Sequence, residues 1–267
     1  MSSFLSHREN INKIIEISKV AGDAIMDIYE TNFDYELKED NSPLTIADKT
    51  SNEIICKSLR DLTPKIPILS EESSQIPFRK RSSWKKYWLI DPLDGTKEFI
   101  KRNGEFTVNI ALINEGKPVF GVIRVPAQGE LYWGLEGVGS YFIDKNDSKN
   151  KIHVSDNYEQ LKIVSSRSHP SPELQSLLDH GDFLDLTQAG SSLKFCMLAH
   201  GIVDAYPRLN PTSEWDIAAG HAIINSAGGT ILDLKGNNMI YNSKDELTID
   251  GFFALNNQIN FEKFNQK

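Results

Sequence analysis

The sequence predicts an α/β protein in which an α+β part is followed by an α/β part. Two stretches with apolar residues at helical spacing open the chain, at 9–30 and 48–63. Short β-type segments joined by Gly, Asn and Pro turns follow, up to residue 143. Beyond residue 151 strands and helices alternate, which is typical of an α/β layer. We therefore expect two parts, residues 1–150 and 151–267.

Composition bounds the function. The 267 residues can bury a substantial core, as one large domain or two modest ones, and 39% hydrophobic and 25% charged residues are ordinary globular values. The net charge of −8 argues against a nucleic-acid duplex as partner, because duplex binding needs a basic face. An acidic protein that handles phosphates must create positive potential locally, through metal ions or a few placed Lys and Arg side chains.

The first part starts with two helices. The first places Ile11, Ile14 and Ile15 on one face, and the second begins near Asp48 and ends before Pro64. The segment "IPILSEES" predicts a short strand that ends at a pair of acids. Five further strands are expected at "YWLID", "FTVNIALI", "VFGVIRVP", "ELYWGLEG" and "SYFID".

The second part follows a polar stretch, "DKNDSKNK" at residues 144–151, which predicts a loop near a domain boundary. After it the sequence predicts alternating elements. The expected strands are "LKIVSS", "DFLDL", "VDAYPRL" and "TILDL", and the expected helices are "PELQSLLDH", "SSLKFCMLAHG" and "EWDIAAGHAIINSAGG".

Cysteine use and the N-terminus bear on location. Cys56 and Cys196 lie far apart in apolar helical contexts and predict buried, inert thiols rather than a disulfide or a zinc site. The first residues lack the basic and apolar regions of a signal peptide, and no run approaches the roughly 18 apolar residues of a membrane span. We expect a cytoplasmic protein, with loose attachment to the inner membrane surface and the oligomeric state left open.

Five acids fall at the ends of elements. Glu71 and Asp91 end strands, Asp94 lies in the turn that follows, and Asp48 and Asp216 open helices. Carboxylates at the carboxyl ends of apolar strands are typical of α/β active sites and suit Mg²⁺. The alternative is structural, because Asp-Pro and Asp-Gly form turns, and "TIAD" and "SEWD" fit capping boxes. Spacing alone leaves both interpretations open.

Phosphatases with an aspartyl nucleophile have a sequence motif similar to "DPLDGT". The haloacid-dehalogenase pattern is Asp-x-Asp-x-Thr after the first strand, with acids two residues apart. Here Asp91 and Asp94 are three apart and lie a third of the way along the chain. This spacing argues against an aspartyl-phosphate route.

Four ordered motifs resemble a known family. "DPLDGTKEFI" is similar to the Asp-Pro-(Leu/Ile)-Asp-Gly-Thr signature of the inositol monophosphatase superfamily, and "EWDIAAGHAIINSAGG" resembles its second signature. "SPLTIADKTSNE" and "LSEES" match two further landmarks, and the resemblance covers essentially the whole chain. It implies a layered αβαβα sandwich with the active site between the two parts. "SRSHP", "GSSLKFC" and "AYPRLNPTSEWD" look like the bacterial CysQ type, the 3'(2'),5'-bisphosphate nucleotidases.

The resemblance implies a set of metal ligands. Glu71, Asp91 and the backbone carbonyl of Leu93 would hold a first Mg²⁺, and Asp91, Asp94 and Asp216 a second. Some family members place a third, weaker Mg²⁺ near Glu71. Inhibition by Li⁺ is a further expectation, since Li⁺ can replace a weakly held Mg²⁺.

It also implies catalytic residues. Asp48, near the third ion, matches the acid that pairs with the signature threonine, Thr96, to orient and activate a water. Gly95 and Thr96 would offer backbone N–H groups to the phosphate, because a glycine lets the backbone come close.

Substrate contacts are implied elsewhere in the chain. Ser191, Lys194 and Arg208 lie where nucleotidases of this superfamily hold adenosine 3',5'-bisphosphate, and His169 matches a further contact. Of the metal ligands, the acids at positions 71 and 216 would touch substrate as well. Asn210 stands where we expect glycine in relatives of this type.

The activity implied is removal of the 3'-phosphate from adenosine 3',5'-bisphosphate to give AMP, with 3'-phosphoadenylyl sulfate as a second substrate and a place in sulfur metabolism. Two alternatives stay open. One is an inositol-phosphate or sugar-phosphate monoesterase of the same superfamily, and the other is a sensor of nucleotide or metal without turnover. The basic residues distinguish a bisphosphate nucleotidase from the first alternative. An inositol phosphate has no nucleoside with a second phosphate, so an enzyme for it does not need these residues to hold its substrate.

Overall fold

The computed structural model describes Leu5 and residues 8–37, 43–168, 171–180 and 183–264. Its helices are α1 (Arg8–Tyr29), α2 (Ile46–Leu62), α3 (Phe78–Arg81), α4 (Thr96–Ile100), α5 (Pro172–His180), α6 (Leu193–Ala199) and α7 (Glu214–Ser226). Three 3-10 turns accompany them, at Glu71–Ser73, Pro126–Gln128 and Gln258–Phe264.

Two sheets form the frame of the molecule. The larger has seven strands in chain order, β3 (Ile68–Ser70), β4 (Lys86–Asp94), β5 (Thr107–Asn114), β6 (Lys117–Val125), β7 (Glu130–Leu135), β8 (Gly139–Ile143) and β9 (Lys149–Ile152). Its first pair is parallel and the later pairs are antiparallel. The smaller has five strands in the order β11 (Phe183–Ala189), β10 (Leu161–Ser166), β12 (Ala205–Arg208), β16 (Phe252–Leu255) and β14 (Thr230–Leu232). Two short ribbons pair β1 (Tyr35–Leu37) with β2 (Pro43–Thr45) and β13 (Thr212–Ser213) with β15 (Thr248–Ile249).

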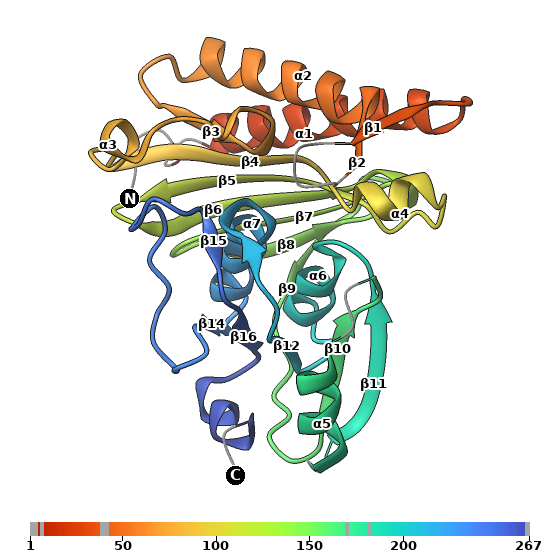
Figure 1. The fold of residues 1–267 in the computed structure, drawn as a ribbon, viewed down its shortest axis with the longest axis vertical. Helices are drawn as coiled ribbons and strands as arrows, with labels where there is room; N and C mark the ends of the chain where they lie inside the picture. The colour runs from red at the N-terminus through yellow and green to blue at the C-terminus, as the bar shows by residue number, and fades with distance from the viewer. Residues whose placement is uncertain (1–4, 6–7, 38–42, 169–170, 181–182, 265–267) are drawn as a thin grey trace.

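The elements stack in five layers (Figure 1). Helices α1 and α2 share a buried apolar cluster with one face of the large sheet. Helices α6 and α7 fill the space between the sheets with a second cluster. The crossovers β10–α5–β11 and β11–α6–β12 run in opposite directions along the small sheet, so right-handed connections place α5 on its outer face. The result is the αβαβα sandwich that the sequence predicts.

Helix α7 carries one of the predicted ligands and packs directly on the large sheet. Nine of its 13 residues are buried. It comes so close that a Cβ added to Gly121 of β6 would lie 2.3 Å from the backbone oxygen of Ala219. Only glycine fits there, and this close approach fixes the start of α7 beside the end of β4.

Most predicted elements are confirmed, and three differ. The second helix begins at Ile46, two residues before Asp48. The predicted loop at 144–151 is wrong in its second half, because Lys149–Ile152 forms β9, an edge strand whose exposed polar side chains hid it. The apolar segment Phe252–Leu255 forms a strand inside the small sheet that the sequence analysis missed. The division near residue 150 falls within β9 and stays a prediction.

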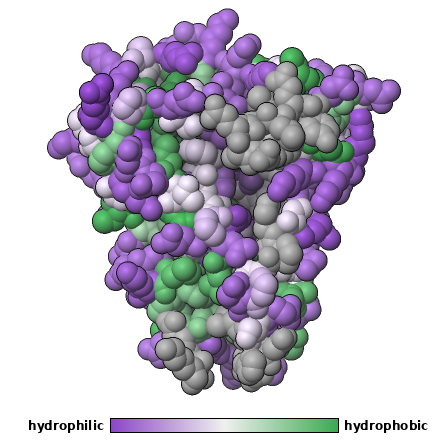
Figure 2. All heavy atoms as spheres, viewed as in Figure 1, coloured by the Kyte–Doolittle hydropathy of each residue, from purple (hydrophilic) through white to green (hydrophobic). Residues whose placement is uncertain are grey.

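Polar residues dominate the face shown in Figure 2, and hydrophobic ones appear in small groups, in keeping with the net charge of −8. Among the helices described, none has the length and apolar character needed to cross a bilayer. Cys56 and Cys196 are free and buried, as predicted, and burial raises the pKa of both thiols.

Candidate active site

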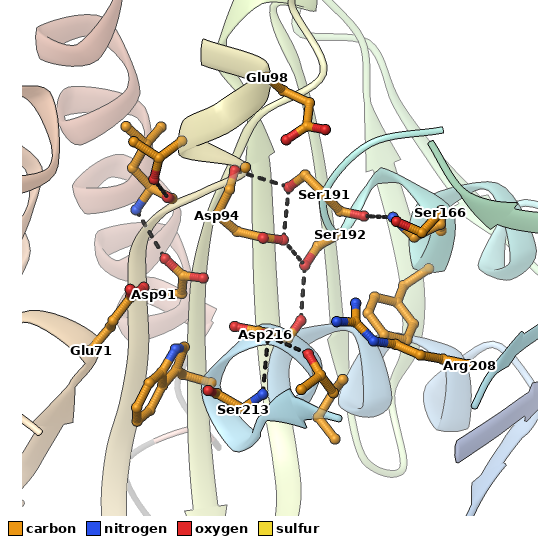
Figure 3. A pocket seen from close by; sticks show the side chains of 18 of the residues that line it. Glu71, Asp91, Asp94, Glu98, Ser166, Ser191, Ser192, Arg208, Ser213 and Asp216 are labelled. Atoms are coloured by element: carbon orange, nitrogen blue, oxygen red, sulfur yellow. Dashed lines mark hydrogen bonds between the residues drawn. The ribbon is translucent and has the colours of Figure 1, made fainter. Parts of the chain in front are cut away.

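A cavity of about 460 Å³ opens where the two parts of the chain meet. It is lined by the end of β4, the start of α4, the segment before α6, the end of β12 and the start of α7. Figure 3 shows acids from β4, from the start of α7 and from the 3-10 turn at Glu71–Ser73 gathered on one side, with the guanidinium of Arg208 opposite. We call Glu71, Asp91, Asp94 and Asp216 the carboxylate wall, and Lys194 and Arg208 the basic wall.

A β-bulge explains how the signature motif brings its two acids together. In a regular strand, residues three apart point to opposite faces. Here Asp91 pairs with Asn109 and Asp94 pairs with Thr107, so an advance of three residues along β4 matches an advance of two along β5. The extra residue turns Asp94 to the same face as Asp91. The bulge therefore brings the two carboxylates of "DPLD" to one face, and their role as cation ligands stays a prediction.

The carboxylate wall concentrates negative charge. One carboxylate oxygen each from Asp91, Asp94 and Asp216 lie within 4.8 Å of one another, and Glu71 faces Asp91 (Figure 3). Burial first, and then the charges of the other three acids, raise the pKa of Asp91 well above its ordinary value. Burial and the charge of Asp94 raise the pKa of Asp216 to about 6. Oxygen donors that repel one another at this separation fit a divalent cation such as Mg²⁺.

The backbone of Leu93 belongs to the same wall. Its N–H donates to Asp91 Oδ1 at 3.1 Å and so orients that carboxylate. Its carbonyl oxygen lies 3.3 Å from Thr96 Oγ1, and the residue lines the cavity. The structure thus places this carbonyl beside the acids with which the sequence analysis grouped it.

Asp48 is a helix cap and a neighbour of the site at once. Its Oδ2 accepts from the N–H and hydroxyl of Thr45, at 2.7 Å and 2.6 Å, which closes the predicted capping box of α2. Its Oδ1 accepts from the hydroxyl of Thr96 at 3.1 Å. The carboxylate is buried, so both contacts form away from bulk water. The predicted pairing of Asp48 with Thr96 is present.

Asp216 is also held by a helix cap, through one of its carboxylate oxygens. Its Oδ2 accepts from the backbone N–H of Ser213 at 3.1 Å, as expected for the "SEWD" capping box, and from the hydroxyl of Thr212. These bonds hold the carboxylate at the first turn of α7, where it faces Asp91 and Asp94. The capping box of α7 thus places Asp216 in the carboxylate wall, as the capping box of α2 places Asp48 beside Thr96.

On the basic wall, Lys194 is buried and turned toward backbone oxygens. Its Nζ donates to the carbonyls of Ser191 and Ala189, at 2.6 Å and 3.1 Å, and lies 5.2 Å from the ring centre of Tyr206. Ser191 lies ahead of α6 rather than in it. The predicted helical turn between these two residues is therefore only partly formed, because the helix begins at Leu193.

Arg208 ends β12, as the sequence predicts, and lines the cavity. Its guanidinium donates to the backbone oxygens of Asn210 and Pro211, at 3.4 Å and 3.1 Å. Burial opposes its charge, but the hydroxyl of Tyr206 and the carboxylate of Asp216 outweigh this and raise its pKa. Asn210 thus presents its main chain, not its side chain, to the arginine.

Ser191 contacts the carboxylate wall. Its hydroxyl donates to Asp94 Oδ2 at 2.7 Å, and its backbone has a φ of +49°. Gly95, at the turn after β4, has a φ of +87°, and a Cβ there would lie 3.0 Å from the Cβ of Ser191. Gly95 and Thr96 line the cavity, as predicted. His169 lies outside the described residues.

Three buried polar residues next to the site escaped the sequence analysis, namely Thr107, Asn109 and Ser192. The first two alternate within the apolar strand "TVNIALI", so both point to the face that carries the acids. Two polar residues, two positions apart at the start of an otherwise apolar strand, were the sequence signal that could have identified Thr107 and Asn109 as part of the site.

Comparison with known proteins assigns the family. The sequence profile described as "Inositol monophosphatase family" matches residues 7–264. The chain belongs to this family. Within the family it is 44% identical to the 3'(2'),5'-bisphosphate nucleotidase CysQ of Salmonella typhimurium over 91% of this chain and 98% of the relative. It is 43% identical to the protein of that name from Escherichia coli strain K12, with the same coverage.

Solved structures of family members share the fold. The crystal structure of CysQ from Bacteroides thetaiotaomicron aligns with a TM-score of 0.81 and 39% identity, covering 94% of this chain and 98% of that one. The suhB protein of Bartonella henselae aligns with a TM-score of 0.80 and 27% identity, covering 96% and 98%. The fold predicted from the motifs is confirmed.

Proposed function

We propose that this family member is a Mg²⁺-dependent 3'(2'),5'-bisphosphate nucleotidase that hydrolyses the 3'-phosphate of adenosine 3',5'-bisphosphate to AMP and phosphate. It would act on 3'-phosphoadenylyl sulfate in the same way. The observation that carries the proposal is a cavity with three clustered carboxylates on one wall and two cationic side chains on the other. The CysQ relatives, at 43% and 44% identity over 91% of the chain, support this substrate class.

The carboxylate wall fits the metal part of this activity. Glu71, Asp91 and the carbonyl of Leu93 would hold one Mg²⁺, and Asp91, Asp94 and Asp216 a second, with a third near Asp48 and Glu71. When bound, such cations offset the charge of the phosphate and stabilise the leaving oxygen.

The pair Thr96 and Asp48 fits the task of orienting water. Because the Thr96 hydroxyl donates its proton to Asp48 Oδ1, its oxygen keeps lone pairs for a proton of the attacking water. A water held there would direct its own lone pair toward phosphorus. The backbone of Gly95 and Thr96 offers N–H groups to the phosphate oxygens.

The basic wall fits the rest of the substrate. Arg208 presents a permanently charged planar group at the cavity, and Lys194, which is buried, adds a second cation. Together they would hold the 5'-phosphate while the 3'-phosphate meets the carboxylate wall. Ser191 joins the two walls through its contact with Asp94. His169 remains a predicted further contact, and the cytoplasm the predicted location.

Phosphate release tests the proposal. The full-length protein is incubated with adenosine 3',5'-bisphosphate, 3'-phosphoadenylyl sulfate or inositol 1-phosphate, each with Mg²⁺ and with EDTA in excess. We expect Mg²⁺-dependent release, with a higher kcat/KM for the two nucleotides than for the inositol ester. A clear preference for inositol 1-phosphate would overturn the role given to the basic wall. Absence of turnover with every ester would favour a sensor.

A further inference from the structure

One carboxylate oxygen of Asp94 is hydrogen-bonded by other residues of the protein. Its Oδ2 accepts from the hydroxyls of Ser191 and Ser192, each at 2.7 Å. Both serines come from the segment before α6, almost a hundred residues further along the chain. Figure 3 shows the two serines on the side of Asp94 that faces away from Asp91. The carboxylate is therefore anchored through one oxygen.

A second layer of buried polar groups stands behind this contact. The side-chain amide of Asn109 donates to Ser192 Oγ at 2.8 Å. The hydroxyl of Thr107 donates to Asn109 Oδ1 at 3.1 Å and lies 2.6 Å from Ser191 Oγ. Thr107 and Asn109 are 0% and 1% exposed, as is expected of groups whose bonds must all be made within the protein.

The register of the large sheet explains why these groups meet. Across the bulge, Thr107 is the cross-strand partner of Asp94 and Asn109 is the partner of Asp91. Directly paired residues project from the same face of a sheet. The first residues of β5 thus lie on the same face as the two signature acids. Ser192 links Asn109 to Asp94 by accepting a hydrogen bond from the first and donating one to the second.

Counting protons gives the chain of bonds a direction. The side-chain nitrogen of Asn109 faces Ser192, and an amide nitrogen can only donate. Ser192 Oγ then receives a proton from Asn109 and has one proton of its own to donate. It has two acceptors within reach, Asp94 Oδ2 at 2.7 Å and the carbonyl of Asp216 at 2.9 Å. The charged acceptor makes the stronger bond.

We propose that Asn109 and Ser192 are positioning residues that fix the Asp94 carboxylate and thereby set the affinity of the carboxylate wall for a divalent cation. This deepens the proposed function, on which it rests only for Asp94 as a cation ligand. Asn109 acts through Ser192, and Ser192 acts through Asp94. An anchored carboxylate loses little freedom when a cation binds, whereas an unanchored one must be ordered first.

Mg²⁺ titration of the full-length protein without substrate tests this, by isothermal calorimetry on the wild type and on Ser192→Ala, Asn109→Ala and the double variant. Ser140→Ala is the matched control, because Ser140 is also fully buried and donates to a backbone oxygen of α7, Ile223 O at 2.6 Å. Thermal unfolding establishes that each variant is folded before titration.

We expect Ser192→Ala and Asn109→Ala each to weaken Mg²⁺ binding at least about tenfold, the usual effect of groups that orient a metal ligand. The double variant should be no weaker than Ser192→Ala, because the two residues act in series. Ser140→Ala should bind as the wild type does. Asn109→Ala alone carries the test if Ser192→Ala does not fold.

Two results would overturn the proposal. One is Mg²⁺ binding in Ser192→Ala or Asn109→Ala equal to that in Ser140→Ala. The other is an additive loss in the double variant, which would mean that the residues act independently. The titration contains no nucleotide, so it is independent of turnover. If the Mg²⁺ affinities are as expected but the protein releases no phosphate from any ester, the positioning roles of Asn109 and Ser192 stand and the nucleotidase activity is refuted.

Discussion

The two walls of the cavity reach their positions by different physical routes. On the carboxylate wall the backbone determines where the side chains point, through a bulge at Asp91–Asp94 and a helix cap at Asp216. Because the aspartate side chains are short, they have little conformational freedom. On the basic wall, Lys194 and Arg208 are long and donate to nearby carbonyl oxygens. The acids are thus directed by the backbone that carries them, whereas the two basic side chains are held by hydrogen bonds to carbonyls two to five residues away in the chain. Chemistry should therefore depend on the first wall and choice of substrate on the second.

The largest expected effect is at the centre of the carboxylate wall. Asp91→Asn should lower kcat by more than about a thousandfold, at the upper end of what one group acting on transition-state charge supplies. The same variant should lose most Mg²⁺ binding, since Asp91 faces every other acid of the wall. Steady-state phosphate release and calorimetry measure both effects. Asp185→Asn, on the exposed face of β11, is the control, and comparable losses there would contradict a specific role.

A smaller effect is expected beside that wall. Thr96→Val keeps the shape but removes the hydroxyl that bonds to Asp48, and should lower kcat about a hundredfold, the scale of a lost proton-handling group. Mg²⁺ affinity should stay near the wild-type value, which separates orientation of water from metal binding. Asp48→Asn should lose kcat and also about 1 kcal/mol of stability, because it weakens the cap of α2. Unchanged turnover in Thr96→Val would remove this pair from the mechanism.

On the basic wall the effect should depend on the substrate. Arg208→Ala should raise KM for adenosine 3',5'-bisphosphate about tenfold, as for loss of one charged hydrogen bond. KM for adenosine 3'-phosphate, which lacks the second phosphate, should change little. Lys194→Met should show the same selectivity, and Arg79→Ala, on the exposed surface, should change neither substrate. An equal rise for both nucleotides would mean that the walls do not divide the work as described.

Outside both walls, the expected effect is on stability and the effect on turnover is the smallest. His221 is buried on α7 and bonded to Tyr241 at 2.9 Å, and burial lowers its pKa to about 3. The unfolded chain takes up this proton below about pH 6.5, whereas the folded chain does not until about pH 3. Stability should thus fall as pH drops from 6.5 toward 3, by at most about 1.4 kcal/mol per pH unit for this group.

Urea unfolding at several pH values measures this slope. His221→Gln should flatten it while leaving turnover at neutral pH close to that of the wild type. An unchanged slope would mean that the His221 imidazole takes up its proton in the folded protein as readily as in the unfolded chain.

The sequence placed the acids of the carboxylate wall at element ends, where strands and caps determine the direction of a side chain, but this alone did not show that they converge. It did not predict the bulge, since a spacing of three by itself points Asp91 and Asp94 to opposite faces. The motif resemblance grouped them correctly, and the register shift supplies the physical reason.

The sequence was less informative where packing decides. Nothing local indicates that Lys194 turns toward the carbonyls of Ala189 and Ser191. The contact of Asn109 with Ser192 joins residues 83 positions apart and exists only because the two parts of the chain pack face to face. Edge strand β9 and the short strand β16 escaped for related reasons, since one is polar and the other only four residues long.

Identification of the nucleotide product tests the division between the walls most directly. Adenosine 3',5'-bisphosphate is hydrolysed with Mg²⁺ and the products are separated by chromatography against the two adenosine monophosphates. We predict 5'-AMP and one equivalent of phosphate, because the carboxylate wall acts on the 3'-phosphate while the basic wall holds the other. Accumulation of adenosine 3'-phosphate would contradict this orientation of the substrate.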